Sequence, residues 1–185
     1  MCLHELNGPA PISREGLKTY LSIFNPEFKD VTVADANNYR WLGFTPVSNP
    51  SDWTIKGSEV SDGTLRAFGI LLAIFQAGNP GSPVSLVGLE EPESNLHPAA
   101  AGVLLDALLE ASRSVPIIAS THSADLLDRK GLPENALLAV ALADGETVIG
   151  PVSKEGKSIL RQRLYTAGDL LRNDHLTPSV TGAST

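Results

Sequence analysis

Two adjacent glutamates end a hydrophobic run in the segment VSLVGLEE, residues 84–91. The uncharged run lies between Pro83 and Pro92, and its composition predicts a buried strand of a parallel sheet. Isolated carboxylates are costly beside an apolar core, so the pair indicates that something at the strand tip requires charge. Glu90 could hold Mg²⁺ through water, and Glu91 could orient or deprotonate an attacking water. The simpler alternative is a pair of solvated carboxylates at the end of a strand.

A histidine follows a second predicted strand. The segment PIIAST, residues 116–121, is apolar and β-branched, and His122 comes directly after it. If the two strands are parallel neighbours, His122 lies at the same sheet edge as Glu90 and Glu91, where ligands bind in open α/β sheets. An imidazole there can donate a hydrogen bond to a terminal phosphate and hold a water in line. A lone histidine is otherwise more often an ordinary core or surface residue.

A third candidate is the motif SDGT, which comes immediately before the long apolar segment of residues 65–78. Ser61 and Asp62 are good helix N-caps, and Gly63 allows the backbone to approach a ligand closely. Thr64 completes the motif. The free amides of a helix N-terminus bind anions such as phosphate, although SDGT alone could equally be a simple cap.

Helices and strands must position these side chains. Hydrophobic periodicity and turn residues predict helices over about 13–24, 65–78, 98–113, 124–129 and 157–172, and strands over about 31–35, 84–91, 116–121, 136–142 and 146–150. The alternation after residue 61 predicts one α/β unit with a largely parallel sheet and an antiparallel edge. We expect an N-terminal segment of irregular and strand pieces (residues 1–60), an α/β lobe (residues 61–175) and a flexible tail (residues 176–185).

Composition and net charge exclude several classes of function. The 185 residues carry 14 basic and 21 acidic side chains, a net charge of −7, which argues against a nucleic-acid surface over the whole chain. Residues 61–150 hold 4 basic and 11 acidic side chains, as in a solvated acidic face or a carboxylate-rich metal site. Cys2 is the single cysteine, which excludes an internal disulfide. Without a signal peptide or an apolar run of roughly 20 residues, we expect a cytoplasmic protein with no membrane partner.

Four motifs in a fixed order resemble the ABC-type ATPases of the SMC-like AAA family. They are SDGTLR at residues 61–66, the strand that ends in EE at residues 85–91, SNLH at residues 94–97 and STHS at residues 120–123. The resemblance implies a P-loop NTPase fold of the ABC type, with helices on both sides of the sheet. It also implies that the four motifs are the signature motif, the Walker B strand, the D-loop and the switch-histidine segment.

The resemblance further implies a role for each motif residue. Glu91 would be the catalytic carboxylate, His122 the switch histidine, and Glu90 the residue that supports Mg²⁺. The signature motif would contact the γ-phosphate of ATP bound to the opposite subunit, so the implied partner is a second ATPase head, in a homodimer or heterodimer, with ATP and Mg²⁺ as cofactors. The residues that would contact nucleotide are Ser61, Asp62, Gly63, Thr64, Ser94, Asn95 and His97.

One expected motif is missing. The family's phosphate loop, GxxxxGK[ST], and its glutamine loop precede the signature motif, and neither occurs in residues 1–60. The only GKS is at residues 156–158, where Pro151 replaces the first glycine and lacks the N–H that a phosphate-wrapping loop needs. This GKS also follows the Walker B strand. We therefore expect a head without its N-terminal phosphate-loop part, and weak or no ATP turnover by the chain alone.

Several functions fit these motifs. The leading hypothesis is an ATPase head in DNA repair or maintenance or in phage defence, with nucleic acid or an effector protein as a further partner. A second is a non-catalytic, truncated or split half that regulates or completes a partner ATPase. A third, a magnesium-dependent phosphohydrolase or nuclease using Glu90, Glu91 and Glu93, lacks further clustered ligands. Basic residues gather near the C-terminus and could face phosphates, although a solvated helix face is the simpler interpretation. They are Lys154, Lys157, Arg161, Arg163 and Arg172.

Overall fold

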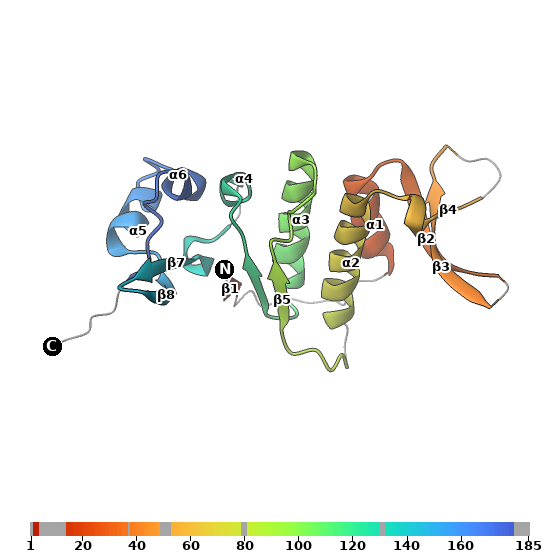
Figure 1. Cartoon of the computed structure of the whole chain (residues 1–185), viewed down its shortest axis with the longest axis horizontal. Helices are drawn as coiled ribbons and strands as arrows, with labels where there is room; N and C mark the ends of the chain where they lie inside the picture. Colours follow the sequence, from red (N-terminus) through yellow and green to blue (C-terminus); the bar gives the residue numbers. More distant parts are fainter. Residues whose placement is uncertain are drawn as a thin grey trace.

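The structure is a computed structural model and describes residues 2–3, 14–36, 38–48, 53–78, 81–129 and 132–179. The helices are α1 Arg14–Phe24, α2 Asp62–Ala77, α3 Pro98–Ala111, α4 Ala124–Leu127, α5 Lys154–Arg161 and α6 Ala167–Arg172, with 3₁₀ turns η1 Gly57–Glu59 and η2 Glu134–Ala136. The strands are β1 Cys2–Leu3, β2 Phe28–Ala36, β3 Tyr39–Pro46, β4 Ile55–Lys56, β5 Val87–Glu90, β6 Ile117–Ser120, β7 Leu138–Ala143 and β8 Glu146–Pro151. The molecule is elongated, with β2–β4 at one end and α5, α6 and the β7–β8 hairpin at the other (Figure 1).

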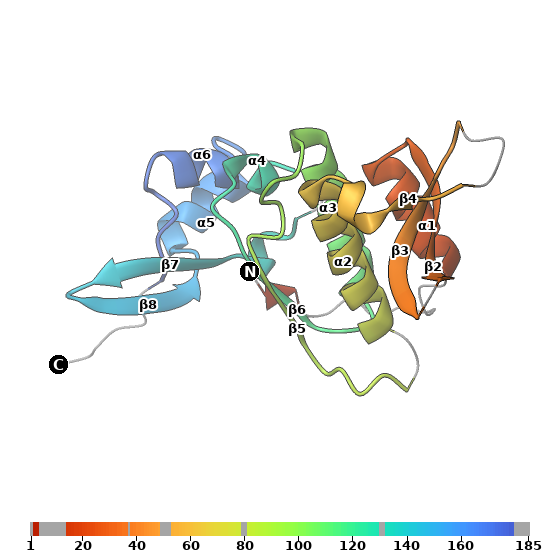
Figure 2. The ribbon, with the colours of Figure 1, turned by 45° about the vertical axis from the view of Figure 1, so that its right-hand side comes forward.

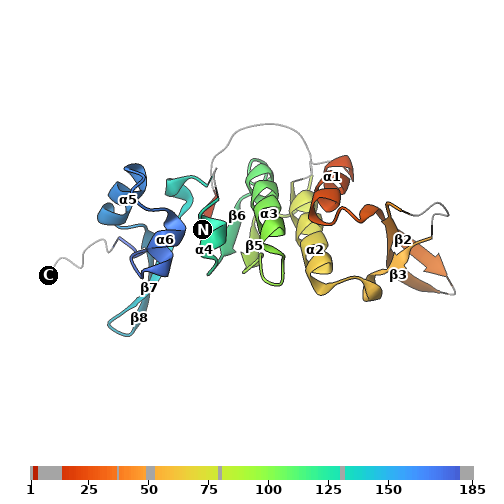
Figure 3. The same cartoon turned by 90° about the horizontal axis from the view of Figure 1, so that it is seen from above.

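The middle of the molecule is an α/β layer that carries the predicted site. β6 lies between β1 and β5, and β5 and β6 run parallel with Glu90 opposite Ser120. Helices α2 and α3 lie side by side and pack against these strands (Figure 3). The buried residues at this contact include Leu71, Ile74, Leu104, Leu108 and Ile117. The predicted α/β class with parallel strands is therefore confirmed.

The N-terminal part is more regular than the sequence predicts. β2, β3 and β4 form an antiparallel sheet, and the strand predicted over residues 31–35 lies inside β2. Phe44 of β3 packs against Phe28 of β2 and Phe68 of α2, with ring centroids 5.3 Å and 5.7 Å away. This aromatic cluster attaches the antiparallel sheet to α2. The predicted first helix corresponds to α1, and Ser13 lies outside the described residues.

The C-terminal part corrects one prediction. The single helix expected over residues 157–172 is wrong, because the chain forms α5 and then α6. Between them Arg163 has a φ of +55°, which a continuous helix cannot contain. Thr166 then begins α6 in a capping box with Asp169. Apolar residues recur across both helices, so their spacing alone suggested one helix.

The rest of the C-terminal part follows the expected order. β7 and β8 form the predicted hairpin, with Asp144 and Gly145 in its turn at positive φ. Part of the expected tail is held in place, because Val152 bridges to Pro178; residues 180–185 lie outside the described residues. Within the described ranges, no helix is both long and apolar enough to cross a bilayer.

Candidate functional site

Strands β5 and β6 lie side by side (Figure 2), and the predicted catalytic residues come together at their tips. The two strands are parallel and in register, so the residues that follow them leave the sheet at the same edge. The backbone N–H of Glu91 donates to the oxygen of Ser120 at 3.0 Å. Across this edge, Nε2 of His122 lies 3.5 Å from Oε1 of Glu91. The carboxylate and the imidazole therefore face each other.

Glu91 has a polar neighbour at each of its carboxylate oxygens. Ser94 Oγ donates to Oε2 at 3.0 Å, and His122 approaches Oε1. The backbone φ of Glu91 is +41°, in the left-handed region that residues other than glycine rarely adopt. The Glu91 side chain is still 43% exposed, and that of His122 is 89% exposed. An oriented carboxylate that water can reach is suited to act as a general base.

Glu90 occupies a different environment from its neighbour. Its side chain is exposed and alternates with that of Leu89, which packs on the helix-covered face of the sheet. Across the described residues, no group of three or more His, Cys, Asp or Glu side chains could hold a metal. Mg²⁺ commonly takes one or two carboxylates and completes its shell with water and phosphate oxygens. Glu90 therefore fits a metal ion that binds together with a nucleotide.

Arg66 ties α2 to the tip of β5. Its Nη2 donates to the backbone oxygens of Glu90 and Glu91, both at 3.0 Å. This contact attaches the helix that follows SDGT to the backbone that presents both carboxylates. Arg66 belongs to the predicted signature motif, but this role is not visible in the sequence, because a hydrogen bond to a distant carbonyl leaves no local pattern.

The N-terminus of α2 is capped by the SDGT motif. Ser61 Oγ accepts from the backbone N–H of Thr64 at 3.3 Å and lies 2.8 Å from Thr64 Oγ1. Asn25, from the segment after α1, donates to Thr64 Oγ1 at 3.2 Å. The amides of Asp62 and Gly63, in the first turn of the helix, have no acceptor within it. These two N–H groups are the ones that the motif can offer to an anion.

Gly63 lies directly against Asn95, in the segment predicted to be the D-loop. A Cβ at Gly63 would come within 2.5 Å of the backbone oxygen of Asn95, so the approach requires glycine. Beside it is a cleft of about 450 Å³ between the start of α2 and the D-loop. Among the predicted nucleotide contacts, the cleft is lined by Ser61, Gly63, Thr64, Asn95 and His97. Asp62 and Ser94 do not line the cleft, and Ser94 binds Glu91 instead.

The GKS segment is part of a helix. Its three residues lie inside α5, and the side chain of Ser153 caps this helix by accepting from the N–H of Gly156 at 3.2 Å. A Cβ at Gly156 would lie 2.7 Å from Cγ1 of Val152, so this glycine serves close packing. The segment is therefore helical, and its glycine and the serine before the helix serve packing and capping.

Solved structures with a similar fold are ATPase heads. One, described as "Structural biochemistry of ATP-driven dimerization and DNA stimulated activation of SMC ATPases", has a TM-score of 0.57 and 16% identity, over 84% of this chain and 92% of that chain. Another, an SMC head domain from Thermotoga maritima, has a TM-score of 0.50 and 21% identity, over 76% of this chain and 47% of that chain. This chain thus spans about half of the Thermotoga head. The fold is that of the P-loop NTPase heads of SMC ATPases.

The sequence itself defines the family. Residues 10–128 match the family described as "AAA domain, putative AbiEii toxin, Type IV TA system". Because the match covers well over half of the 185 residues, the chain belongs to this family of AAA domains. A comparison with curated proteins finds no match.

Proposed function

We propose that this chain is one half of an ABC-type ATPase site. It would supply the signature helix, Glu91 and His122, and hydrolyse ATP with a partner subunit that brings the phosphate loop. The observation that carries this proposal is the geometry of Glu91, whose carboxylate accepts a hydrogen bond from Ser94 and lies 3.5 Å from Nε2 of His122.

Each side chain of the site has a chemical task in this proposal. Glu91 would take the proton of the attacking water, and His122 would donate a hydrogen bond to a phosphate oxygen. The amides of Asp62 and Gly63 would bind the terminal phosphate of ATP held by the partner. Glu90 would support Mg²⁺, which neutralises phosphate charge when it is bound.

The remaining predicted contacts lie around the same cleft. Ser61 and Thr64 would keep the first turn of α2 in shape through their mutual hydrogen bonds. Asn95 and His97 line the cleft on the D-loop side, where a nucleotide from the partner would enter. Ser94 would orient Glu91.

The face of the central sheet that does not pack against α2 and α3 is exposed, which favours a partner. Gly88, Glu90 and Ser120 are exposed on this face, and Ile118 is 43% exposed. Parallel strands are almost always covered on both faces. A further layer of structure, from an additional segment or a second subunit, would cover these residues. The SMC ATPases in the similar structure are described as dimerising in an ATP-driven way, which favours a second ATPase head as the partner.

The description of the family bears on the choice between defence and DNA maintenance. It names a putative toxin of a type IV toxin–antitoxin system, which supports a role in defence more than one in DNA maintenance. The similar SMC ATPases are described as DNA-stimulated, so DNA is the first effector to add to the assay below.

Steady-state ATP hydrolysis by the purified chain, with and without a complete SMC-like ATPase head, tests the proposal. We expect no turnover by the chain alone and turnover by the mixture above that of the head alone. This excess should fall about 100-fold or more with Glu91→Gln, because general-base catalysis typically contributes that much. Glu146→Gln, in the exposed hairpin, is the matched control and should leave turnover unchanged. Robust turnover by the chain alone, abolished by Glu91→Gln, would contradict the half-site proposal.

Size-exclusion chromatography of the same mixtures, read together with their ATP turnover, distinguishes the half-site proposal from the non-catalytic alternative. A half that only regulates its partner would associate with the head in the presence of ATP, yet Glu91→Gln would leave the turnover of the mixture unchanged.

A further inference from the structure

The segment that carries His122 is fixed at its start by Glu93, in the turn after Glu91. Thr121 Oγ1 donates to Oε1 of Glu93, and it accepts from the backbone N–H of Ser123 at 2.9 Å. The second oxygen of Glu93 is buried and has no hydrogen-bond partner among the described residues. A glutamate held in this way between two loops connects the turn after Glu91 directly to the residue before His122.

The same segment is fixed at its end by α4 and α6. Ser123 caps α4 by accepting from the N–H of Leu126 at 3.2 Å. α6 then packs on the first turn of α4 so closely that a Cβ at Gly168 would come within 2.3 Å of the backbone oxygen of Ala124. His122 is two residues away from this contact, which gives a shift of α6 a short path along the backbone to the imidazole.

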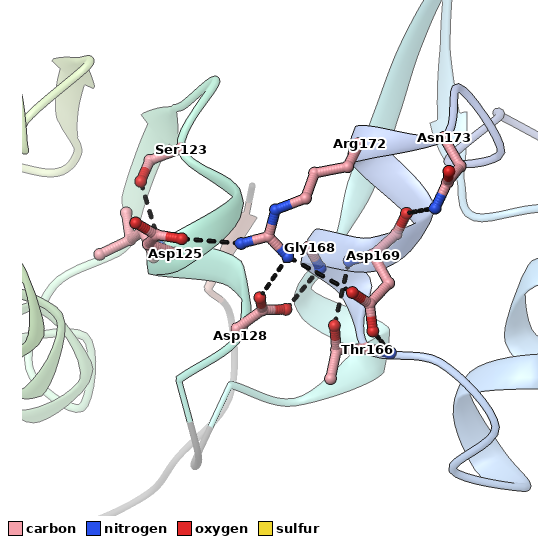
Figure 4. A network of polar contacts seen from close by, with 9 residues as sticks. Ser123, Asp125, Asp128, Thr166, Gly168, Asp169, Arg172 and Asn173 are labelled. Carbon is pink, nitrogen blue, oxygen red and sulfur yellow. Dashed lines mark hydrogen bonds and ion pairs between the residues drawn. The ribbon is translucent and has the colours of Figure 1, made fainter.

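Arg172 holds α4 and α6 together (Figure 4). Its Nη2 lies 2.7 Å from Oδ1 of Asp125, and its Nη1 lies 2.8 Å from Oδ2 of Asp128 and 3.4 Å from Oδ1 of Asp169. The other oxygen of Asp128 accepts from the N–H of Gly168 at 2.9 Å. Without Arg172, three carboxylates would face one another across the contact of the two helices, and their repulsion would weaken this contact.

We propose that Glu93 and Arg172 are positioning residues for His122, and that α6 thereby controls the approach of the imidazole to Glu91. The side chain of His122 is 89% exposed, and its polar partner among the described residues is Glu91 at 3.5 Å. Its position therefore depends on the backbone, which Glu93 holds through Thr121 and Arg172 holds through α4. The catalytic consequence rests on the function proposed above, whereas the positioning does not.

The positioning is measured on the isolated chain by NMR with ¹³C,¹⁵N-labelled histidine at one fixed pH. The chain has 4 histidines, and His122→Gln identifies the ring signals of His122. Glu93→Ala and Arg172→Gln should shift or broaden these signals, because the ring leaves its defined place beside Glu91. Glu93→Gln keeps an oxygen for Thr121 and should restore signals close to those of the native chain.

Arg161→Gln is the matched control. Arg161 also pairs with a carboxylate in the C-terminal part, Glu134 at 3.0 Å, but this pair does not involve α4. Its loss should leave the His122 signals in place. If Arg172→Gln unfolds the chain, Asp125→Asn is measured instead, because it removes only the ion pair between Asp125 and Arg172. Unchanged His122 signals in a folded Arg172→Gln or Asp125→Asn chain would overturn the proposal, as would equal shifts with Arg161→Gln.

ATP hydrolysis by the mixture with a complete head gives the catalytic consequence. Arg172→Gln should lower kcat on the order of tenfold and leave KM within about twofold, because a small displacement of a catalytic group affects the transition state more than substrate binding. A rise in KM at unchanged kcat would contradict the proposal. If the mixture does not hydrolyse ATP while the NMR shifts occur as expected, the ATPase proposal fails and the positioning of His122 stands.

Discussion

The backbone oxygen of Asn95 lies so close to Gly63 that a Cβ on the glycine would come within 2.5 Å of it. The first turn of α2 and the D-loop are therefore in direct backbone contact, and both line the same cleft. A side chain on Gly63 would push apart the two segments that are proposed to meet the nucleotide of the partner.

Gly63→Ala tests this contact. We expect the free energy of unfolding to fall by about 1–3 kcal/mol, because the neighbouring atom is backbone and cannot rotate away. Gly69→Ala, in the same helix, is the control: its Cβ would meet nothing within 4 Å. It should raise the free energy of unfolding by about 0.5–1 kcal/mol, since glycine is a poor helix former. Urea unfolding of both variants gives the comparison, and equal effects would contradict the steric explanation.

Arg66→Met should weaken the attachment of α2 to the tip of β5. Two hydrogen bonds to the carbonyls of Glu90 and Glu91 are lost at a partly exposed position, so we expect a loss of about 1 kcal/mol in thermal or urea unfolding. Arg40→Met removes an exposed pair with Asp35, whose side chain is 60% exposed, and should change stability by less than about 0.5 kcal/mol. A smaller loss with Arg66→Met than with Arg40→Met would refute this role of Arg66.

Tyr20 provides a pH-dependent prediction. Its hydroxyl donates to Oε2 of Glu110 at 2.5 Å, and burial, with the carboxylate as a second cause, raises the pKa of Tyr20 well above its ordinary value. The folded chain thus keeps this proton more tightly than the unfolded chain. The stability that it contributes is present below about pH 10, the ordinary pKa, and is lost as the pH rises above it.

Tyr20→Phe removes this titration and keeps the ring beside Phe75. Below pH 10 the variant should be less stable than the native chain by about 1 kcal/mol, the usual worth of one hydrogen bond. Above pH 10 the difference should shrink, because only the native chain loses stability through this group. Urea unfolding from pH 7 to pH 11 measures it, and a difference that does not change over this range would be inconsistent with the raised pKa of Tyr20.

Lys157→Ala tests whether the GKS segment has any part in nucleotide binding. Lys157 lies inside α5, so the substitution should leave ATP binding and turnover by the mixture with a complete head unchanged. Fluorescent-nucleotide titration provides the measurement, and Lys154→Ala in the same helix is the matched comparison. A tenfold or larger loss of affinity with Lys157→Ala alone would show that the segment does hold phosphate.

Much of the site could be predicted because its residues follow hydrophobic strands. The glutamates directly after VSLVGL and the histidine directly after PIIAST indicate the strand tips, and parallel pairing then places Glu91 near His122. The contacts that fix the site were not predictable in the same way. Arg66, Glu93 and Thr121 act on partners more than 20 residues away, and no local periodicity reports such a pairing.

Two regions differ from the sequence-based expectation, each for its own physical reason. The antiparallel sheet of β2–β4 is attached by aromatic packing of Phe44, which depends on a helix that comes later in the chain. The break between α5 and α6 depends on a positive φ at Arg163 and on a capping box at Thr166. Arginine seldom takes that conformation, so its identity gave no warning of the turn.

The left-handed backbone conformation of Glu91 lowers the stability of the fold, whereas its carboxylate serves the proposed reaction. A residue with a Cβ in this conformation costs about 1–2 kcal/mol, whereas glycine adopts it freely and asparagine more easily than most. Substitutions to glycine or asparagine would therefore relax the chain at the same time as they removed the carboxylate. At this position, a substitution to glycine or asparagine would therefore make the chain more stable and less active. The demands of folding alone do not explain why a glutamate is found there.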